Sequence, residues 1–370
     1  MTDLLHTLFE YCEQVQASDI HLAVGQMPRF RIQGILSPNP TFPEISVPVM
    51  DEIVQRLGAT SLSRERVFAT LQTRGSIDGA TTSPSGSRYR FNLFLNAGTY
   101  AVALRRLDAA FRSLQELELP QCLADFCQCR DGLVIITGPT GSGKSTTLAT
   151  LLNQINRSRD GHIITIEDPI EYVHESRRCL VNQRQVGRDA ASFHAALVEA
   201  MRQDPDVILV GEIRDLDTIR TAITAAETGH LVFTTLHAGD CAGAVERIVS
   251  VFPAEEQDGI RHQLAMVLRG VFAQHLVPAA DGRARVPVYE LMVVTSAVAN
   301  LIATGRSKQL YSAIELGQPQ GMVTTDQCLS ALLQRGRISK QVALLLAHNP
   351  NALLGHLAKN GAPQPKGDAR

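Results

Sequence analysis

The sequence has almost no excess of charge of either sign. Its 370 residues include 35 Lys and Arg against 37 Asp and Glu, a formal net charge of −2. A basic footprint is expected of proteins that move along nucleic acid, so this balance argues against a nucleic-acid motor. Cysteines are few and scattered, and Cys122, Cys127 and Cys129 lack the C-x-x-C spacing of a zinc ribbon or a disulfide framework. We therefore expect reduced thiols in a cytoplasmic protein.

Long hydrophobic runs are also lacking. The first six residues contain no basic stretch followed by an apolar core, so no signal peptide is predicted. The apolar run at 207–210 is long enough only for a strand, and no run is long enough for a transmembrane segment. If this protein works at a membrane, it does so by docking to something already there.

The first 106 residues mix one helix with several alternating segments. Apolar residues at helical spacing predict a helix over 4–15. From 87 to 95 the pattern alternates, which places the arginines and Asn92 on one face of a strand and the large apolar residues on the other. Residues 79–86, with Ala, Thr, Ser and Pro between two glycines, predict a loose connection between strands. This region is typical of a small α+β domain with an antiparallel sheet.

The rest of the chain divides into four parts. Residues 107–131 predict a linker with a short helix. Strands and helices alternate over 132–287, which is typical of a parallel sheet, and 288–358 predict a cluster of helices. The end, 359–370, has Pro, Gly and charge and predicts a disordered tail. We therefore expect an α/β protein in which an α+β domain precedes a parallel-sheet core and a helical subdomain.

A glycine-rich run carries most of the functional signal. It fits G-x-x-x-x-G-K-[ST], follows an apolar strand at 133–137 and precedes a predicted helix at 145–156. In this context the glycines let successive backbone N–H groups turn toward one phosphate, and the helix start adds its positive dipole end. Lys144 would reach the β- and γ-phosphates of ATP, and the Ser145 hydroxyl would ligate Mg²⁺. The predicted nucleotide-binding residues are Gly138, Pro139, Thr140, Gly141, Ser142, Gly143, Lys144, Ser145 and Thr146.

Two further strands end in carboxylates, which a phosphate-binding loop needs for its metal and its water. One apolar strand runs into Glu212, the layout of a Walker B element that holds Mg²⁺ through water. The strand at 163–166 leads into three carboxylates within five residues, Glu167, Asp168 and Glu171. Their mutual repulsion must be offset by cations or metal in a folded site. One of the three is expected to position water as the general base, and the pattern leaves open which one.

Histidines and arginines supply the remaining candidates. His230 and His237 stand at the two ends of one predicted strand, and their odd separation puts them on opposite faces, which argues against a shared metal site. We expect at least one of them to contact nucleotide, because a protonated imidazole can pair with phosphate. Arg88, Arg90 and Arg105 cluster in the first domain. They form either a solvated basic face or an arginine finger matched to phosphate.

Together these elements resemble the Walker A, Asp box, Walker B and His box of the secretion-superfamily hexameric ATPases, which drive type IV pili and type II and type IV secretion. The chain is similar to the PilT/PilU-like pilus retraction ATPases over about residues 3–355. The combination of boxes is far more specific than a phosphate-binding loop alone. The segments that support the resemblance are residues 18–22, 88–92, 181–184, 225–229 and 321–327.

The resemblance implies a PAS-like amino-terminal domain, a RecA-like ATPase domain and a homohexameric ring with ATP and Mg²⁺ between the two domains. By position in the Asp box Glu171 would be the catalytic base, and Glu212 would be the Walker B acid. The three arginines match family arginines that approach the phosphates, and both histidines match the His box. The ring would act on the inner-membrane platform protein of the pilus and so associate peripherally with that membrane. A paralogous retraction ATPase is a further candidate partner.

Two features bear on which branch of the superfamily this is. Assembly and secretion ATPases usually carry a longer amino-terminal region and a four-cysteine zinc motif, whereas only Cys241 and Cys328 follow the Walker B strand here. This favours retraction. Where the retraction family has an Ala-Ile-Arg-Asn-Leu motif, this chain has Ala299 in place of the arginine. The alternatives are an assembly or secretion ATPase, a PilU-like accessory motor and a non-motor regulator that binds ATP.

Overall fold

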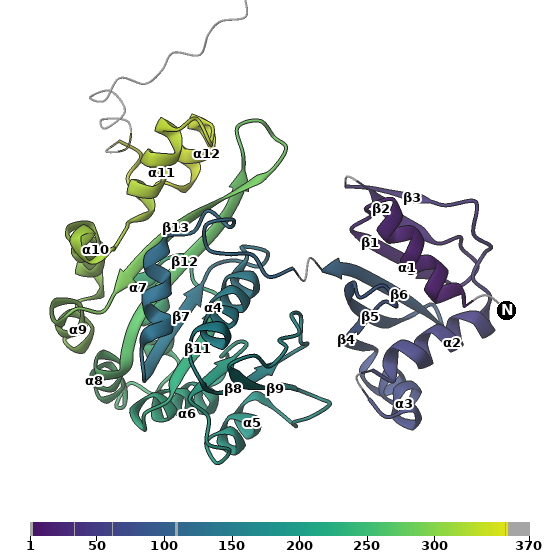
Figure 1. The fold of residues 1–370 in the computed structure, drawn as a ribbon, viewed down its shortest axis with the longest axis horizontal. Helices are drawn as coiled ribbons and strands as arrows, with labels where there is room; N and C mark the ends of the chain where they lie inside the picture. The colour runs from purple at the N-terminus through teal and green to yellow at the C-terminus, as the bar shows by residue number, and fades with distance from the viewer. Residues whose placement is uncertain (1–2, 33, 61, 108–109, 352, 354–370) are drawn as a thin grey trace, which may run out of the picture. The chain divides into compact units, whose positions relative to one another are not determined.

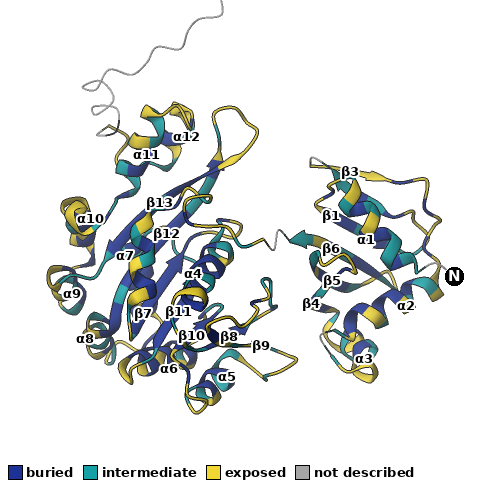
Figure 2. Cartoon of the chain, viewed as in Figure 1, coloured by how far each residue is buried: buried dark blue, intermediate teal, exposed yellow. Residues whose placement is uncertain are grey.

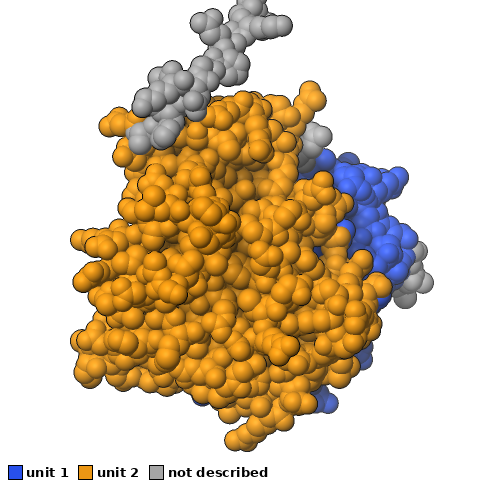
Figure 3. Space-filling view, turned by 60° about the vertical axis from the view of Figure 1, so that its left-hand side comes forward, with its two compact units in different colours: residues 1–110, 166–175, 183–196 blue, residues 111–165, 176–182, 197–370 orange. Residues whose placement is uncertain are grey.

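The computed structural model describes residues 3–32, 34–60, 62–107, 110–351 and 353. The chain divides into two compact units, which Figure 3 colours separately. The first unit holds residues 1–110, 166–175 and 183–196, and the second holds residues 111–165, 176–182 and 197–370. The disordered tail predicted for 359–370 lies outside the described residues. In the part of the chain that is described, no helix is both long and apolar enough to cross a bilayer.

The first unit is built on a six-stranded sheet in the order β3-β2-β1-β6-β5-β4, whose paired strands all run antiparallel. Three helices pack on it (Figure 1). The strands are β1 (Asp19–Ala23), β2 (Arg29–Ile32), β3 (Ile35–Pro38), β4 (Ser76–Thr82), β5 (Arg88–Asn96) and β6 (Thr99–Leu107). The helices are α1 (Leu4–Gln14), α2 (Val47–Gly58) and α3 (Arg64–Arg74). The predicted α+β domain with an antiparallel sheet is confirmed.

Strand β5 shows why this sheet has one apolar face. Tyr89, Phe91 and Leu93 are buried in the core with the three helices, whereas Arg90 is exposed and Asn92 is half-buried between them. Figure 2 colours the strands of this sheet by burial. The predicted alternation is therefore confirmed. The loose connection predicted over 79–86 was wrong for residues 79–82, because β4 continues to Thr82. All seven residues of β4 pair with β5, and this pairing outweighs the low strand propensity of Gly79.

The second unit is built on a seven-stranded sheet in the order β13-β12-β7-β11-β10-β8-β9. Its central pairs, β10 with β11, β11 with β7 and β7 with β12, run parallel, and β13 runs antiparallel to β12. The strands are β7 (Gly132–Thr137), β8 (Gly161–Glu167), β9 (Cys179–Gln185), β10 (Val207–Val210), β11 (Leu231–Leu236), β12 (Leu268–Pro278) and β13 (Arg285–Val293). The predicted parallel core is confirmed.

Helices cover the sheet of the second unit, and its central strands β7, β10 and β11 are buried along their whole length. One side of β7 packs against α4 and η1 in a single hydrophobic cluster, and α6 packs against β7 and β11. The helices are η1 (Gln121–Gln128), α4 (Lys144–Ser158), α5 (Phe193–Ala200), α6 (Leu216–Glu227), α7 (Cys241–Ser250) and α8 (Gln257–Val267). The helix predicted over 190–202 is shorter at both ends than expected.

The carboxyl-terminal helices begin later than predicted. Strand β13 crosses the expected boundary between 287 and 288, because its backbone pairs with β12 over its whole length. The helices after it are α9 (Ser296–Ala303), η2 (Ser307–Gln309), α10 (Leu310–Leu316), η3 (Gln318–Gln320), α11 (Thr325–Gln334) and α12 (Lys340–Leu346).

We expect Phe233→Ala to destabilise the second unit strongly. Phe233 lies in the middle of β11 and is 0% exposed, so truncation would leave a cavity costing about 3–5 kcal/mol. Leu180→Ala is the control, since Leu180 is 56% exposed, and it should change stability by no more than about 0.5 kcal/mol. Urea denaturation monitored by circular dichroism measures both. Equal losses in the two variants would contradict this account of the core.

Candidate nucleotide-binding site

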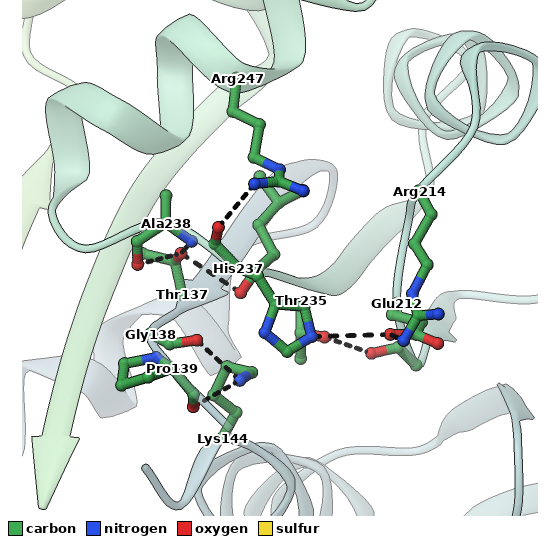
Figure 4. A network of polar contacts seen from close by, with 12 residues as sticks. Thr137, Gly138, Pro139, Lys144, Glu212, Arg214, Thr235, His237, Ala238 and Arg247 are labelled. Carbon is green, nitrogen blue, oxygen red and sulfur yellow. Dashed lines mark hydrogen bonds and ion pairs between the residues drawn. The ribbon is translucent and has the colours of Figure 1, made fainter. Parts of the chain in front are cut away.

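The parallel strands β7, β10 and β11 bring three loops to one edge of the sheet. Their register places Thr137 beside Leu236, and Thr234 beside Val210, so the three strands end close together. The chain then continues into the glycine-rich loop after β7, into Glu212 after β10 and into His237 after β11. The carboxyl ends of parallel strands are where open α/β sheets bind ligands. Figure 4 shows this edge at close range.

The glycine-rich loop has the backbone shape that its sequence predicts. Gly138, Gly141 and Gly143 all have positive φ angles, of 143°, 76° and 93°, and helix α4 starts at Lys144. Gly138 is also confined sterically, because a Cβ atom built on it would lie 2.2 Å from the carbonyl oxygen of Gln274. The loop therefore depends on glycine for its conformation as well as for its close approach to β12.

We expect Gly138→Ala to weaken ADP binding by about tenfold or more. The added methyl overlaps a backbone carbonyl that cannot rotate away, so the loop must shift, at a cost typical of overpacked sites. The control is Gly259→Ala in α8, where a built Cβ meets no described atom within 4 Å. Titration with a fluorescent ADP analogue measures both variants. Unchanged affinity in Gly138→Ala would show that the loop does not hold the phosphates.

Lys144 is held over the loop that it follows. Its Nζ donates hydrogen bonds to the carbonyl oxygens of Gly138 at 2.8 Å and Pro139 at 3.0 Å (Figure 4). Burial lowers the pKa of the ammonium group, and the negative charge of Glu212 opposes this. Phosphate oxygens could replace these two carbonyls as acceptors. Nearby, the buried hydroxyl of Ser142 has no hydrogen-bond partner among the described residues.

Glu212 stands where β10 ends and faces two potential cations. Its Oε2 lies 2.7 Å from Nη2 of Arg214 and 3.8 Å from Nε2 of His237. Burial and the charge of Lys144 lower the pKa of His237, although Glu212 raises it. The lowered pKa favours the neutral form of the imidazole, which weakens its electrostatic attraction to Glu212. Thr235 secures the loop before Glu212 by donating to the carbonyl oxygen of Gly211 at 2.6 Å.

The backbone after β11 is fixed from two sides. Arg247 of α7 donates to the carbonyl oxygen of His237 at 2.9 Å, and Ala238 exchanges hydrogen bonds with the Thr137 hydroxyl. His230 does not lie with Glu212 and His237. It precedes β11 whereas His237 follows it, and the six residues of that strand separate the two histidines by roughly 20 Å. Its Nδ1 lies 2.9 Å from the carbonyl oxygen of Ala225. A nucleotide role for His230 stays a prediction.

The acidic segment after β8 belongs to the first unit, where it meets the predicted arginines. Arg88 Nη2 donates to the carbonyl oxygen of Ile170 at 2.9 Å, and Arg90 Nη1 lies 3.7 Å from Oε1 of Glu171. Burial lowers the pKa of Arg88, and Glu167 opposes this. These two arginines therefore form more than a solvated basic face, although their action on nucleotide stays a prediction.

Arg105 and Glu167 take different partners. Arg105 of β6 is paired with Arg90 of the neighbouring strand β5. Its ion pair is with Asp19, where Nε and Oδ1 lie 2.8 Å apart, and the Arg105 side chain is 70% exposed. Burial raises the pKa of Asp19, but hydrogen bonds from Ser18 and Arg105 outweigh this and leave the pKa low. Glu167 accepts a hydrogen bond from Gln183 at 3.1 Å.

Two residues at the loop were missed by the sequence analysis. Gln274 of β12 accepts a hydrogen bond from the Thr147 hydroxyl of α4 at 2.7 Å and lies under the glycine-rich loop. Arg285 at the start of β13 donates to the carbonyl oxygen of Gly141 at 3.4 Å. Both come from a hairpin more than a hundred positions away in sequence, and no local spacing marks them.

These residues fit ATP with Mg²⁺. The orphaned Ser142 hydroxyl, the glycine positions that a Cβ would fill and the start of α4 form an anion cradle. Ser145 and Glu212 offer the oxygen donors that Mg²⁺ prefers. The described residues contain no cluster of three or more His, Cys, Asp or Glu that could hold a metal. A metal here would complete its shell with phosphate and water oxygens.

Comparisons with known proteins agree with this geometry. Residues 2–339 match the family described as type II/IV secretion system protein. The type IV pilus retraction ATPase PilT of Pseudomonas aeruginosa is 42% identical over 337 residues, which cover 91% of this chain and 96% of that protein. The type IV pilus ATPase PilU of the same organism is 38% identical over 336 residues, covering 91% of this chain and 86% of PilU.

A solved structure gives the same result for the fold. The crystal structure of the pilus retraction motor PilT with bound ADP has a TM-score of 0.85 and 39% sequence identity, covering 95% of this chain and 98% of that one. The chain therefore belongs to the type II/IV secretion system protein family and, within it, to the PilT-like ATPases.

Proposed function

We propose that this protein is a Mg²⁺-dependent ATPase motor that powers retraction of a type IV pilus as a homohexamer. The observation that carries the proposal is the meeting of Lys144, Glu212 and His237 at one edge of a parallel sheet, beside a glycine-rich loop. Similarity to a retraction motor over nearly the full length of both chains supports the client and the direction of force.

The residues of the loop bind and orient the nucleotide. Backbone N–H groups at the start of α4 would take the phosphates, and Lys144 would exchange the carbonyls of Gly138 and Pro139 for phosphate oxygens. Ser145 and Glu212 would hold Mg²⁺, which neutralises phosphate charge when bound. His237 would report on the nucleotide state through its contact with Glu212.

The acidic segment and the arginines complete the proposed machinery. Glu171 would orient the attacking water and take its proton as general base. Arg88, Arg90 and Arg105 would supply positive charge to the transition state, within this chain or to a neighbouring subunit. In this structure Arg90 and Glu171 contact each other. During turnover each would leave this contact, Arg90 for the phosphates and Glu171 for the attacking water.

The proposal extends to fold and partners. We propose that the antiparallel sheet of the first unit is a PAS-like domain, and that the parallel sheet of the second is a RecA-like core. Six copies would form a ring in the cytoplasm, held at the inner membrane by the platform protein of the pilus. Force on that platform protein would return pilin to the membrane.

A second candidate is a PilU-like accessory motor that works beside a paralogous retraction ATPase. The observation that favours it is Ala299 in α9, where the retraction family has an arginine. Ala299 is half-buried beside the buried Val298 and carries no charge for a partner to recognise. Similarity to PilU supports the same possibility.

Piliation of a deletion strain tests the proposal. Retraction predicts more surface pili when the gene is deleted, restored by the wild-type gene but not by Lys144→Ala. Loss of surface pili would instead favour an assembly or secretion ATPase. Unchanged piliation that increases only when the paralogue is also deleted would favour the accessory motor. Electron microscopy of surface pili and a twitching assay provide the readouts.

A further inference from the structure

Glu290, in the middle of β13, is a buried carboxylic acid that the proposed mechanism does not use. It is 2% exposed, and among the described residues no Lys, Arg or His forms an ion pair with it. Burial raises its pKa, and Asp240 adds to this, whereas hydrogen bonds from Cys241 and Thr325 oppose it. A buried carboxyl group without a cation is costly unless hydrogen bonds satisfy its oxygens.

The hydrogen bonds come from the first residues of two helices. Oε1 accepts from the backbone N–H of Cys241, where α7 begins, at 2.9 Å. Oε2 lies 3.3 Å from the hydroxyl and 3.5 Å from the backbone nitrogen of Thr325, where α11 begins. Helix starts leave N–H groups unpaired and carry partial positive charge, so they take the place of a cation. One side chain thus binds two helices that are 84 residues apart in sequence.

Helix α7 leads directly to the nucleotide site. Asp240 caps its start by accepting from Gly243 at 2.6 Å, and Arg247 within the helix holds the carbonyl oxygen of His237. His237 in turn lies 3.8 Å from Glu212. Any displacement of α7 relative to the sheet would therefore move His237 relative to the acid at the end of β10.

Helix α11 belongs to the carboxyl-terminal helices, which follow β13 (Figure 1). Thr324 forms a capping box with Gln327 at its start, and the backbone of Val323 pairs with Leu291, next to Glu290. These hydrogen bonds fix the backbone at the start of α11, where the Thr325 hydroxyl donates to Glu290.

We infer that Glu290 is a positioning residue that joins α7 and the His237 loop to the carboxyl-terminal helices, so that the two parts move together. The inference rests on the proposed role of His237 in ATP turnover. Through this link, a change at the nucleotide would reach α11, and a load on the carboxyl-terminal helices would reach His237. No contact of Glu290 with nucleotide is required.

The test combines turnover, nucleotide binding and hydrogen exchange in the full-length protein. We expect Glu290→Ala to reduce kcat by about tenfold while the Kd for a fluorescent ADP analogue changes by less than about threefold. Amide exchange should rise in the peptide covering 237–245 and stay unchanged in 132–137. Glu290→Gln keeps one carbonyl acceptor and should restore most of kcat. Thr325→Val should show an intermediate loss, since it removes only the hydroxyl at α11.

Two results would overturn the inference. One is a wild-type kcat in Glu290→Ala. The other is amide exchange that rises equally over 237–245 and 132–137, because that would indicate general destabilisation. If Glu290→Ala does not fold, Thr325→Val carries the comparison, and wild-type kcat in that variant would overturn the inference. His237→Ala separates this inference from the proposed function. Normal turnover in His237→Ala would remove the role of His237, while the exchange data would still decide whether Glu290 holds α7.

Discussion

Replacing Lys144 with alanine is expected to reduce ATP turnover by at least about 100-fold, the size of effect seen when one preorganised hydrogen-bond donor to a transition state is removed. Lys144 is half-buried, and its ammonium group donates hydrogen bonds to the backbone carbonyl oxygens of Gly138 and Pro139 in the loop. Alanine cannot replace its charge on the β- and γ-phosphates. Phosphate release at saturating ATP and Mg²⁺ measures the effect.

Lys308→Ala is the matched control, because Lys308 is exposed in η2 and lies outside the site. It should retain wild-type turnover. If Lys144→Ala still hydrolysed ATP at a rate close to that of the wild type, the assignment of this chain as a P-loop ATPase would be wrong.

Glu171→Gln is expected to reduce turnover by about 100- to 10,000-fold while leaving nucleotide binding close to that of the wild type. A general base acts on the attacking water and adds little to the binding of the ground state. Phosphate release and titration with a fluorescent ATP analogue separate the two quantities. In this structure Nη1 of Arg90 lies 3.7 Å from Oε1 of Glu171.

The comparison with Glu167→Gln decides between neighbouring carboxylates. Glu167 accepts a hydrogen bond from Gln183, which also donates to the carbonyl oxygen of Tyr172, so it has a structural task in the segment. We expect Glu167→Gln to lose much less activity than Glu171→Gln. A large loss confined to Glu167→Gln would move the role of general base to Glu167.

The parts of the site that sequence predicts are those encoded by local pattern. The glycine spacing around Lys144 determines the loop, and apolar runs determine β7, β10 and β11. Because parallel strands end at a common edge, the sequence predicts that the loop, Glu212 and His237 lie at the same edge of the sheet, and the strand order β7-β11-β10 then brings them together. The alternation that buries Tyr89 is equally local, since side chains on a strand repeat every two residues.

The parts that sequence could not predict depend on contacts between distant segments. Gln274 lies under the loop only because β12 pairs with β7, a register that no spacing reveals. The bond from Arg88 to Ile170 joins residues 82 positions apart. His230 and His237 are equivalent in pattern, yet one precedes β11 and the other follows it, and only the latter reaches Glu212.

The central claim is that this chain hydrolyses ATP as an oligomeric ring. ATP turnover of the purified full-length protein, measured over a concentration series with light scattering in parallel, tests it most directly. The account predicts that turnover per chain rises as hexamers form and that Mg²⁺ is required. Nucleotide binding without turnover, in a preparation that is already hexameric, would contradict it.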